Sequence, residues 1–176
     1  MKLGRALTYA AVVYLTWLAM QAVHELGHIL AAWLTGGTVE RVILEPFAIS
    51  RTDVSPNLSP LAVAWAGPLV GVALPLLIAT ACRWRFRPHR FSAAIADAAQ
   101  VPLRRVVDPR PLADFFAGFC LIANGAYIGI GSFDRIGDAG DLLRHGSSQW
   151  LLVVFGITAI SCGLLMWHLA LQRHRK

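Results

Sequence analysis

The chain has 176 residues, of which 56% are hydrophobic and only 15% are charged, and its mean hydropathy is +0.56. Soluble domains average about 25% charged residues, so this composition excludes an ordinary soluble domain and indicates a membrane protein. The net charge of +6 does not indicate nucleic-acid binding, because the basic residues cluster at the ends of apolar stretches. We therefore expect contact with a lipid bilayer and no nucleic-acid partner.

Four apolar stretches are long enough, or nearly so, to cross a bilayer, which takes about 20 helical residues. They cover residues 7–34, 61–82, 115–133 and 150–171. The loops between them leave no room for a soluble domain. We predict a single domain over residues 1–176, an all-α polytopic membrane protein with a bundle of about four transmembrane helices. The first stretch is too long for a cleaved signal sequence, so we expect it to be retained as a helix.

The first apolar stretch contains His24-Glu25-Leu26-Gly27-His28, an H-E-x-x-H sequence. On a helix, residues i and i+4 share a face, so His24 and His28 can bind one metal ion while Glu25 takes a proton from the attacking water. Ionisable side chains at bilayer depth are costly and usually functional. The alternatives are a polar patch packed against neighbouring helices and a metal site that has lost its chemistry. The better interpretation is a zinc site.

The segment after the first stretch has the composition of extended structure. Gly36 and Gly37 are expected to end the helix, as glycine commonly does. The runs from Thr38 to Leu44 and from Phe47 to Thr52, on either side of Pro46, then predict a small β-hairpin or sheet at the membrane surface.

The second and third stretches carry residues that fit either packing or a site. Gly67 precedes Pro68 in the second stretch, and Gly71 follows at a spacing that lets helices approach closely. Packing alone is the simpler role for the two glycines. Asn124 is the only strongly polar residue inside the third stretch, and its amide needs a partner on another helix or at a site.

An acidic segment, residues 134–141, follows the third stretch, on the side of the membrane where the H-E-x-x-H sequence lies. A catalytic zinc typically takes three protein ligands and keeps one position open. A carboxylate of this segment can supply the third ligand, and Asp138 and Asp141 can share one face of a short helical turn. Asp134, nearer the end of the helix, is the least favoured.

Three further features receive no chemical role. The cysteines lack the spacing of a metal site and are odd in number, so we expect small buried side chains at Cys82, Cys120 and Cys162. Residues 91–101 mix apolar and polar side chains and predict a short interfacial helix. His168 lies near the basic end of the fourth stretch, on the opposite side from the predicted metal site, and is not expected to be a ligand.

The distribution of basic residues predicts the orientation of the chain. With four spans, the N-terminus, the second loop and the C-terminus share one side. That side holds 12 of the 16 basic residues, against four in the first and third loops. The positive-inside rule then places both termini in the cytoplasm. We expect a multi-pass protein of the plasma membrane of a prokaryote.

Taken together, the motif in the first helix, Ala66-Gly67-Pro68 in the second and the Gly137–Asp141 segment after the third make the chain resemble the site-2 protease family of intramembrane zinc metalloproteases. The resemblance covers roughly residues 7–145. It suggests a minimal core, without the PDZ or CBS domains of some relatives. The chain differs from the family at Gly71, where the family commonly has asparagine. It also lacks the family's Asn-Leu-Leu-Pro sequence ahead of the aspartate.

The resemblance implies hydrolysis of a peptide bond in or near the transmembrane segment of a membrane-tethered protein. By that likeness His24, His28 and Asp138 are the Zn²⁺ ligands, with Asp141 as the alternative third ligand, and Glu25 is the general base. Asn124, Gly67 and Pro68 are then candidates for substrate binding. The extended segment near residues 39–52 would offer a strand edge to an unwound substrate.

Two other functions compete with this interpretation. A non-catalytic pseudoprotease would bind transmembrane helices as a scaffold or chaperone; the altered second and third motifs favour it, and the intact H-E-x-x-H argues against it. A metal transporter would need acidic or histidine side chains spread along a pore, whereas only His24, Glu25 and His28 lie deep in a predicted span.

Overall fold

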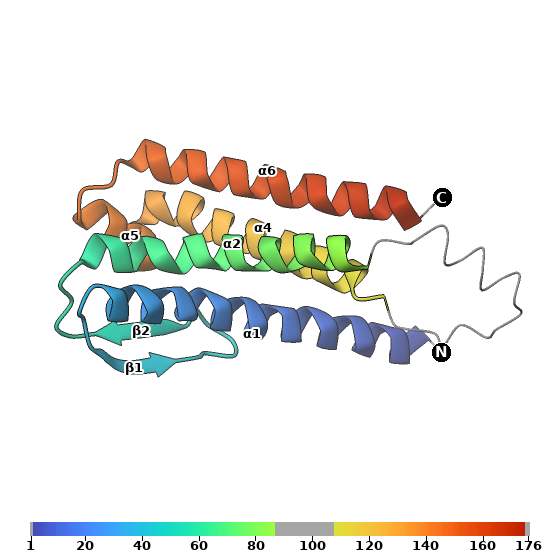
Figure 1. Ribbon diagram of the computed structural model, residues 1–176, viewed down its shortest axis with the longest axis horizontal. Coiled ribbons are helices and arrows are strands. Elements are labelled where there is room, and N and C mark those ends of the chain that lie inside the picture. Colours follow the sequence, from blue (N-terminus) through green and yellow to red (C-terminus); the bar gives the residue numbers. More distant parts are fainter. Residues whose placement is uncertain (1, 87–107, 175–176) are drawn as a thin grey trace, which may run out of the picture.

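The computed structural model describes residues 2–86 and 108–174, and the predicted interfacial helix over residues 91–101 lies outside them. The elements are α1 (Lys2–Leu34), β1 (Val39–Ile43), β2 (Arg51–Val54), α2 (Pro60–Arg85), α4 (Arg110–Asp134), α5 (Gly137–Arg144) and α6 (Gln149–His174). The four long helices run along the length of the molecule (Figure 1). Each is long and apolar enough to cross a membrane, which confirms the prediction of a four-span α-helical membrane protein.

The long helices extend past the predicted apolar stretches at almost every end. Helix α1 begins at Lys2 instead of residue 7, and α4 begins at Arg110 instead of residue 115. At their other ends, α2 continues to Arg85 and α6 to His174. Hydropathy marks only the part of a helix that lies in hydrocarbon, whereas the backbone hydrogen bonds continue through the basic residues expected at the interface.

The predicted hairpin between α1 and α2 is present, but its second strand lies later than expected. β1 and β2 pair antiparallel, with Val42 opposite Thr52. β2 begins at Arg51, not at residue 47. The intervening segment instead folds back on α1, because the Gln21 side chain donates to the Glu45 carbonyl and accepts from the Ser50 amide at 2.9 and 2.7 Å.

Glycines set the distances between neighbouring helices. A β-carbon on Gly27 of α1 would overlap the backbone of Ala66 in α2. A β-carbon on Gly156 of α6 would lie 2.7 Å from the backbone of Gly125 and of Gly129 in α4. Close approach through small residues is the usual way in which membrane helices pack, since lipid provides no hydrophobic drive for their association.

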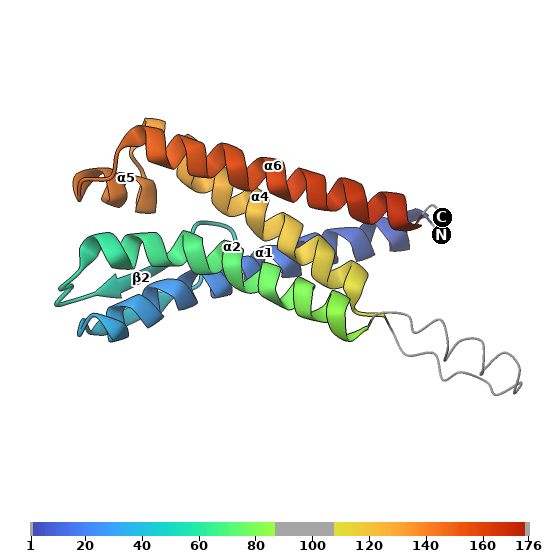
Figure 2. The same ribbon diagram turned by 45° about the horizontal axis from the view of Figure 1, so that its top comes forward.

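The short helix α5 is anchored in the bundle through its apolar face. Ala139 and Leu142 are fully buried and pack with Ala64 of α2, Ile128 of α4 and Leu152 of α6. Figure 2 shows α5 at the end of the α4–α6 pair, across from the hairpin and the end of α1. This packing fixes the start of α5, where Asp138 lies, relative to the membrane helices.

The two ends of the molecule differ in character. The hairpin and α5 lie at one end, and both chain termini lie at the other (Figure 1). Near the terminal end, Arg83 of α2 donates to the buried Asp114 of α4 at 2.9 Å, and Arg173 of α6 lies 3.8 Å from the same carboxylate. These ion pairs tie three of the four long helices together away from the hairpin.

Candidate metal centre

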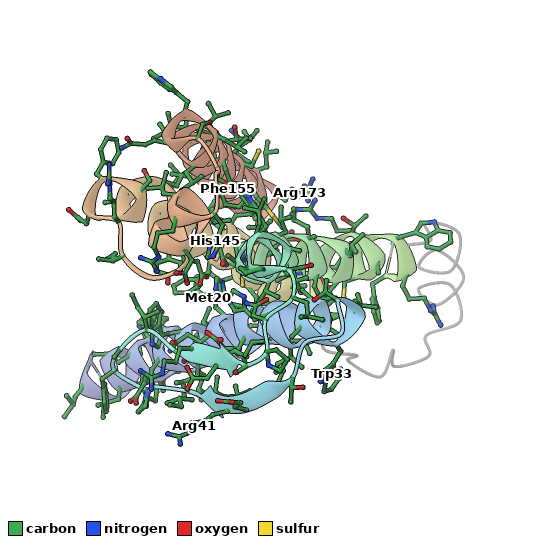
Figure 3. The ribbon with its side chains drawn as sticks, turned by 90° about the vertical axis from the view of Figure 1, so that its left-hand side faces the viewer. Met20, Trp33, Arg41, His145, Phe155 and Arg173 are labelled. Atoms are coloured by element: carbon green, nitrogen blue, oxygen red, sulfur yellow. The ribbon has the colours of Figure 1, made fainter. Side chains whose placement is uncertain are left out.

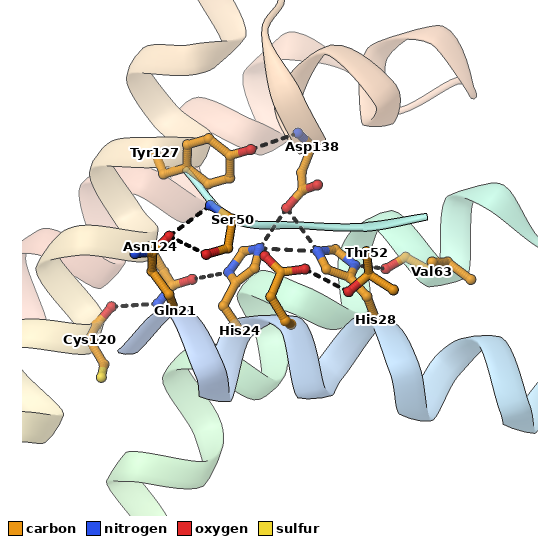
Figure 4. A network of polar contacts seen from close by, with 11 residues as sticks. Gln21, His24, His28, Ser50, Thr52, Val63, Cys120, Asn124, Tyr127 and Asp138 are labelled. Carbon is orange, nitrogen blue, oxygen red and sulfur yellow. Dashed lines mark hydrogen bonds and ion pairs between the residues drawn. The ribbon is translucent and has the colours of Figure 1, made fainter. Parts of the chain in front are cut away.

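The two histidines of the H-E-x-x-H sequence lie on one face of α1 and are both buried, with His24 7% and His28 6% exposed. Their Nε2 atoms are 3.1 Å apart (Figure 4). One turn of helix separates the two residues, so regular helical geometry alone brings their side chains together. The predicted pairing of His24 and His28 is therefore present.

The other ring nitrogen of each histidine is held by an acceptor. Nδ1 of His24 donates to Oδ1 of Asn124 at 2.6 Å, and Nδ1 of His28 donates to the carbonyl of Val63 at 2.7 Å. The Asn124 amide is itself oriented, because its Nδ2 donates to the Cys120 carbonyl at 2.9 Å. An acceptor at each Nδ1 favours the tautomer in which Nε2 is free to bind a metal ion, as in metal-ligating histidines.

The carboxylate of Asp138 completes a three-ligand set. Its Oδ2 lies 2.7 Å from Nε2 of His24 and 3.2 Å from Nε2 of His28. A tetrahedral zinc with ligand bonds of about 2.0–2.1 Å places its ligand atoms about 3.3 Å apart. Two nitrogens and one carboxylate oxygen therefore converge at nearly that spacing, and the residues present fit a zinc ion.

Asp138 is positioned by its own backbone as well as by α5. The backbone N–H of Asp138 donates to the hydroxyl of Tyr127 in α4 at 3.0 Å. Gly137 has φ +50°, and a β-carbon there would overlap the same hydroxyl. Burial alone would raise the pKa of Asp138, but its contacts with His24 and His28 outweigh burial and hold that pKa well below its usual range. Asp138 is thus ionised, as a carboxylate that binds a metal must be.

Glu25 lies beside the three candidate ligands and is only 3% exposed. Candidate ligand atoms of His24, Glu25 and His28 lie within 4.8 Å of one another. The carboxylate of Glu25 accepts a hydrogen bond from the hydroxyl of Thr52 in β2 at 2.7 Å. The hairpin therefore orients the one acidic side chain of α1 that adjoins the candidate ligands.

A family model described as Peptidase M50B-like matches residues 5–99, just over half of the 176-residue chain. The chain belongs to this family. It is therefore a peptidase-family protein of the site-2 protease type, as the motifs in the sequence predicted. No curated protein and no solved structure matches the chain.

The Peptidase M50B-like match includes α1, the hairpin and α2, and thus His24, Glu25 and His28. It ends before α4 and α5, so Asn124 and Asp138 are placed at the centre by the fold alone. Both come from the part of the chain in which the sequence departs most from the family's motifs.

The three residues predicted to bind substrate lie around the histidines. A β-carbon on Gly67 would overlap the His28 ring and lie 2.7 Å from Nε2 of His24, so this glycine makes room for the imidazoles. Pro68 is fully buried within α2. Both polar ends of the Asn124 amide are already used, by His24 and by the Cys120 carbonyl. The contacts of all three are with the protein itself.

The remaining acidic and histidine candidates lie away from the convergence point. Asp141 forms an ion pair with Arg144, and its side chain is 44% exposed. Asp134 is exposed at the end of α4. His168 hydrogen-bonds Gln172 on α6, near the C-terminal end, which agrees with its expected position away from the metal site.

A cleft leads from the surface to the ligands. It has a volume of about 770 Å³ and is lined by β2 on one side and the start of α5 on the other, with His28, Tyr127 and Asp138 inside it. Figure 3 looks onto this end of the molecule, with His145 on the α5 side and Arg41 on the hairpin. All four residues of β2 line the cleft.

Sequence reasoning did not find Thr52 or Tyr127. Tyr127 lies three residues after Asn124, so the two share a helix face, and this spacing was the available signal. Thr52 gave no comparable signal, because the register of the hairpin decides which of its side chains face α1.

Proposed function

We propose that this chain is a zinc-dependent intramembrane endopeptidase that cleaves membrane-tethered proteins. The observation that carries the proposal is the position of Asp138, whose Oδ2 lies within 3.2 Å of Nε2 of both His24 and His28. Two imidazoles and one carboxylate, with a free side facing a cleft, are the ligand set of a catalytic zinc site and not of a closed structural one.

His24, His28 and Asp138 would hold the ion. Zinc in such a site supplies a Lewis acid that polarises the scissile carbonyl and acidifies a water. The residues around the ligands keep them oriented: Asn124 and the Val63 carbonyl fix the imidazoles, and Tyr127 fixes the Asp138 backbone. Such supporting hydrogen bonds usually contribute about 10–100-fold to metal affinity.

Glu25 is the proton carrier of the proposed reaction. Its carboxylate takes a proton from the attacking water, whose oxygen forms a bond with the carbonyl carbon of the substrate. The C–N bond then breaks, and the proton passes from Glu25 to the leaving nitrogen, so that one water is consumed for each peptide bond. The hydrogen bond from Thr52 holds this carboxylate in place through the transfer.

Two surfaces support a membrane-protein substrate. One edge of β2 pairs with β1 and its other side lines the cleft, so an extended peptide can add to it as a third strand. An apolar groove of about 650 Å³ lies between α1 and α4, lined on those helices by Val13, Trp17 and Phe119 among others. If a substrate helix lay in this groove, its unwound end would extend past Trp17 toward Glu25.

We also propose that the cleft opens away from the cytoplasm. The chain termini lie at the end of the bundle opposite the hairpin and α5 (Figure 1). In the sequence, 12 of the 16 basic residues belong to the chain ends, the segment between α2 and α4, and the adjoining helix ends. The positive-inside rule favours the cytoplasmic side for those segments.

The test uses purified protein co-reconstituted in liposomes with a library of tagged single-span reporter proteins, whose transmembrane segments are randomised over eight positions. Mass spectrometry should find cleaved reporters with wild-type protein. The Glu25→Gln variant should keep its zinc and produce no cleavage. Zinc-loaded wild-type protein that binds the reporters and cleaves none of them would contradict the proposal and favour a helix-binding pseudoprotease.

A further inference from the structure

A second, smaller cavity adjoins the candidate ligands on the side away from α5. It has a volume of about 110 Å³ and lies between α1, α4 and the segment that precedes β2. Its walls are the side chains of Trp17 and Met20 from α1, Ala123 from α4, and Ile49. Met20 is nearly fully buried, so the wall that it forms is part of the packed interior and not a surface feature.

The inner end of this cavity reaches the reacting groups. His24 and Glu25 line it, and it shares Ile49, Ser50 and Tyr127 with the large cleft. A peptide that lies along β2 in the cleft, with its scissile bond at Glu25, therefore has one side chain next to the cavity mouth. Successive side chains of an extended peptide point to opposite faces, so only one of the two residues flanking the bond can enter.

The polar groups in the cavity wall are already satisfied. Gln21 bonds to Glu45 and Ser50, and Asn124 bonds to His24 and Cys120. Among the described residues, no buried side-chain nitrogen or oxygen lacks a hydrogen-bond partner. A polar substrate side chain would lose its water and meet only groups that already have hydrogen-bond partners, whereas an apolar one would gain buried area.

We propose that this cavity is the specificity pocket of the enzyme and that it selects a branched aliphatic side chain next to the scissile bond. The inference rests on the proposed peptidase function. The volume of the cavity, about 110 Å³, is smaller than the roughly 150 Å³ of an apolar cavity that holds benzene. Valine, leucine and isoleucine therefore fit, and phenylalanine and tryptophan do not.

The size of the pocket depends on two side chains that can be changed without touching the metal ligands. Ala123→Leu places a larger side chain in the α4 wall and makes the pocket smaller, which should restrict cleavage to substrates with alanine or glycine at this position. Met20→Ala places a smaller side chain in the α1 wall and makes the pocket larger, which should admit phenylalanine. Ala19→Leu is the matched control, because Ala19 adjoins Met20 on α1 but its side chain is exposed.

The reporter library provides the test. For wild-type protein, cleavage products should show leucine, isoleucine or valine over phenylalanine by about 10-fold or more at one flanking position, since a single methylene in an apolar pocket is worth roughly 10–200-fold. Met20→Ala should raise the phenylalanine fraction at least about 10-fold, and Ala19→Leu should reproduce the wild-type profile. Zinc content measured on each variant should equal that of wild type.

Two results would overturn the inference in different ways. Wild-type cleavage with no size preference, or a Met20→Ala profile identical to wild type, would show that the cavity is a packing gap while the peptidase function stands. Absence of all cleavage by zinc-loaded wild-type protein would refute the peptidase function, and the specificity pocket with it.

Discussion

The side-chain amide of Asn124 lies directly against the backbone of Gly71, where a β-carbon would be 2.7 Å from Oδ1 and 2.8 Å from Nδ2. The two residues belong to different helices, α4 and α2. Resemblance to site-2 proteases leads one to expect an asparagine at position 71. In this chain an amide occupies the space beside α2 all the same, but it comes from α4 and orients His24.

Gly71→Ala should weaken zinc binding although residue 71 contacts no ligand. The new methyl group would displace the buried Asn124 amide and release Nδ1 of His24 from its acceptor. We expect zinc affinity to fall about 10–100-fold, the usual effect of losing an orienting hydrogen bond. Competition with a chelator measures it. Gly4→Ala is the control, because nothing lies within 4 Å of a β-carbon there. Equal affinity in both variants would disprove the role of Asn124.

Thr52→Val should separate metal binding from catalysis. The substitution keeps the shape of the side chain and removes the hydroxyl that donates to Glu25. We expect kcat on a cleaved reporter to fall about 10-fold, a part of the 10²–10⁴-fold that a positioned base contributes, with zinc content unchanged. Thr52→Ser retains the hydroxyl and should recover most of kcat. A change confined to KM in Thr52→Val would instead assign Thr52 to substrate binding.

The orientation of the chain can be tested with single cysteines in a background lacking Cys82, Cys120 and Cys162. Ser148→Cys lies between α5 and α6, and Gln172→Cys lies near the C-terminus; both positions are exposed. The positive-inside rule predicts that a membrane-impermeant maleimide labels Ser148→Cys in intact cells and labels Gln172→Cys only after lysis. The reverse pattern would place the cleft on the cytoplasmic side.

The parts of the fold that depend on local sequence were predictable. Hydropathy located the four spans, because about 20 apolar residues in a row have few alternatives to a membrane helix. The i, i+4 spacing of His24 and His28 brought their rings together as expected. The exact helix ends were not predictable, because hydrophobicity does not report where a helix stops beyond the bilayer.

The parts that depend on long-range packing were not predictable from one sequence. The choice between Asp138 and Asp141 depends on how α5 docks through Ala139 and Leu142, and those contacts join four helices. The role of Asn124 depends on the space left by Gly71 on another helix. The contact of Thr52 with Glu25 depends on where β2 begins, which Gln21 fixes by holding the preceding segment on α1.

The central claim is that His24, His28 and Asp138 together hold one zinc, and zinc stoichiometry in aspartate variants tests it most directly. Purified wild-type protein should contain about one zinc per chain. Asp138→Asn should lose most of it, because an amide replaces the carboxylate that faces both imidazoles. Asp141→Asn should retain it, since Asp141 is half-exposed and pairs with Arg144. Full zinc content in Asp138→Asn, with loss in Asp141→Asn, would contradict the account.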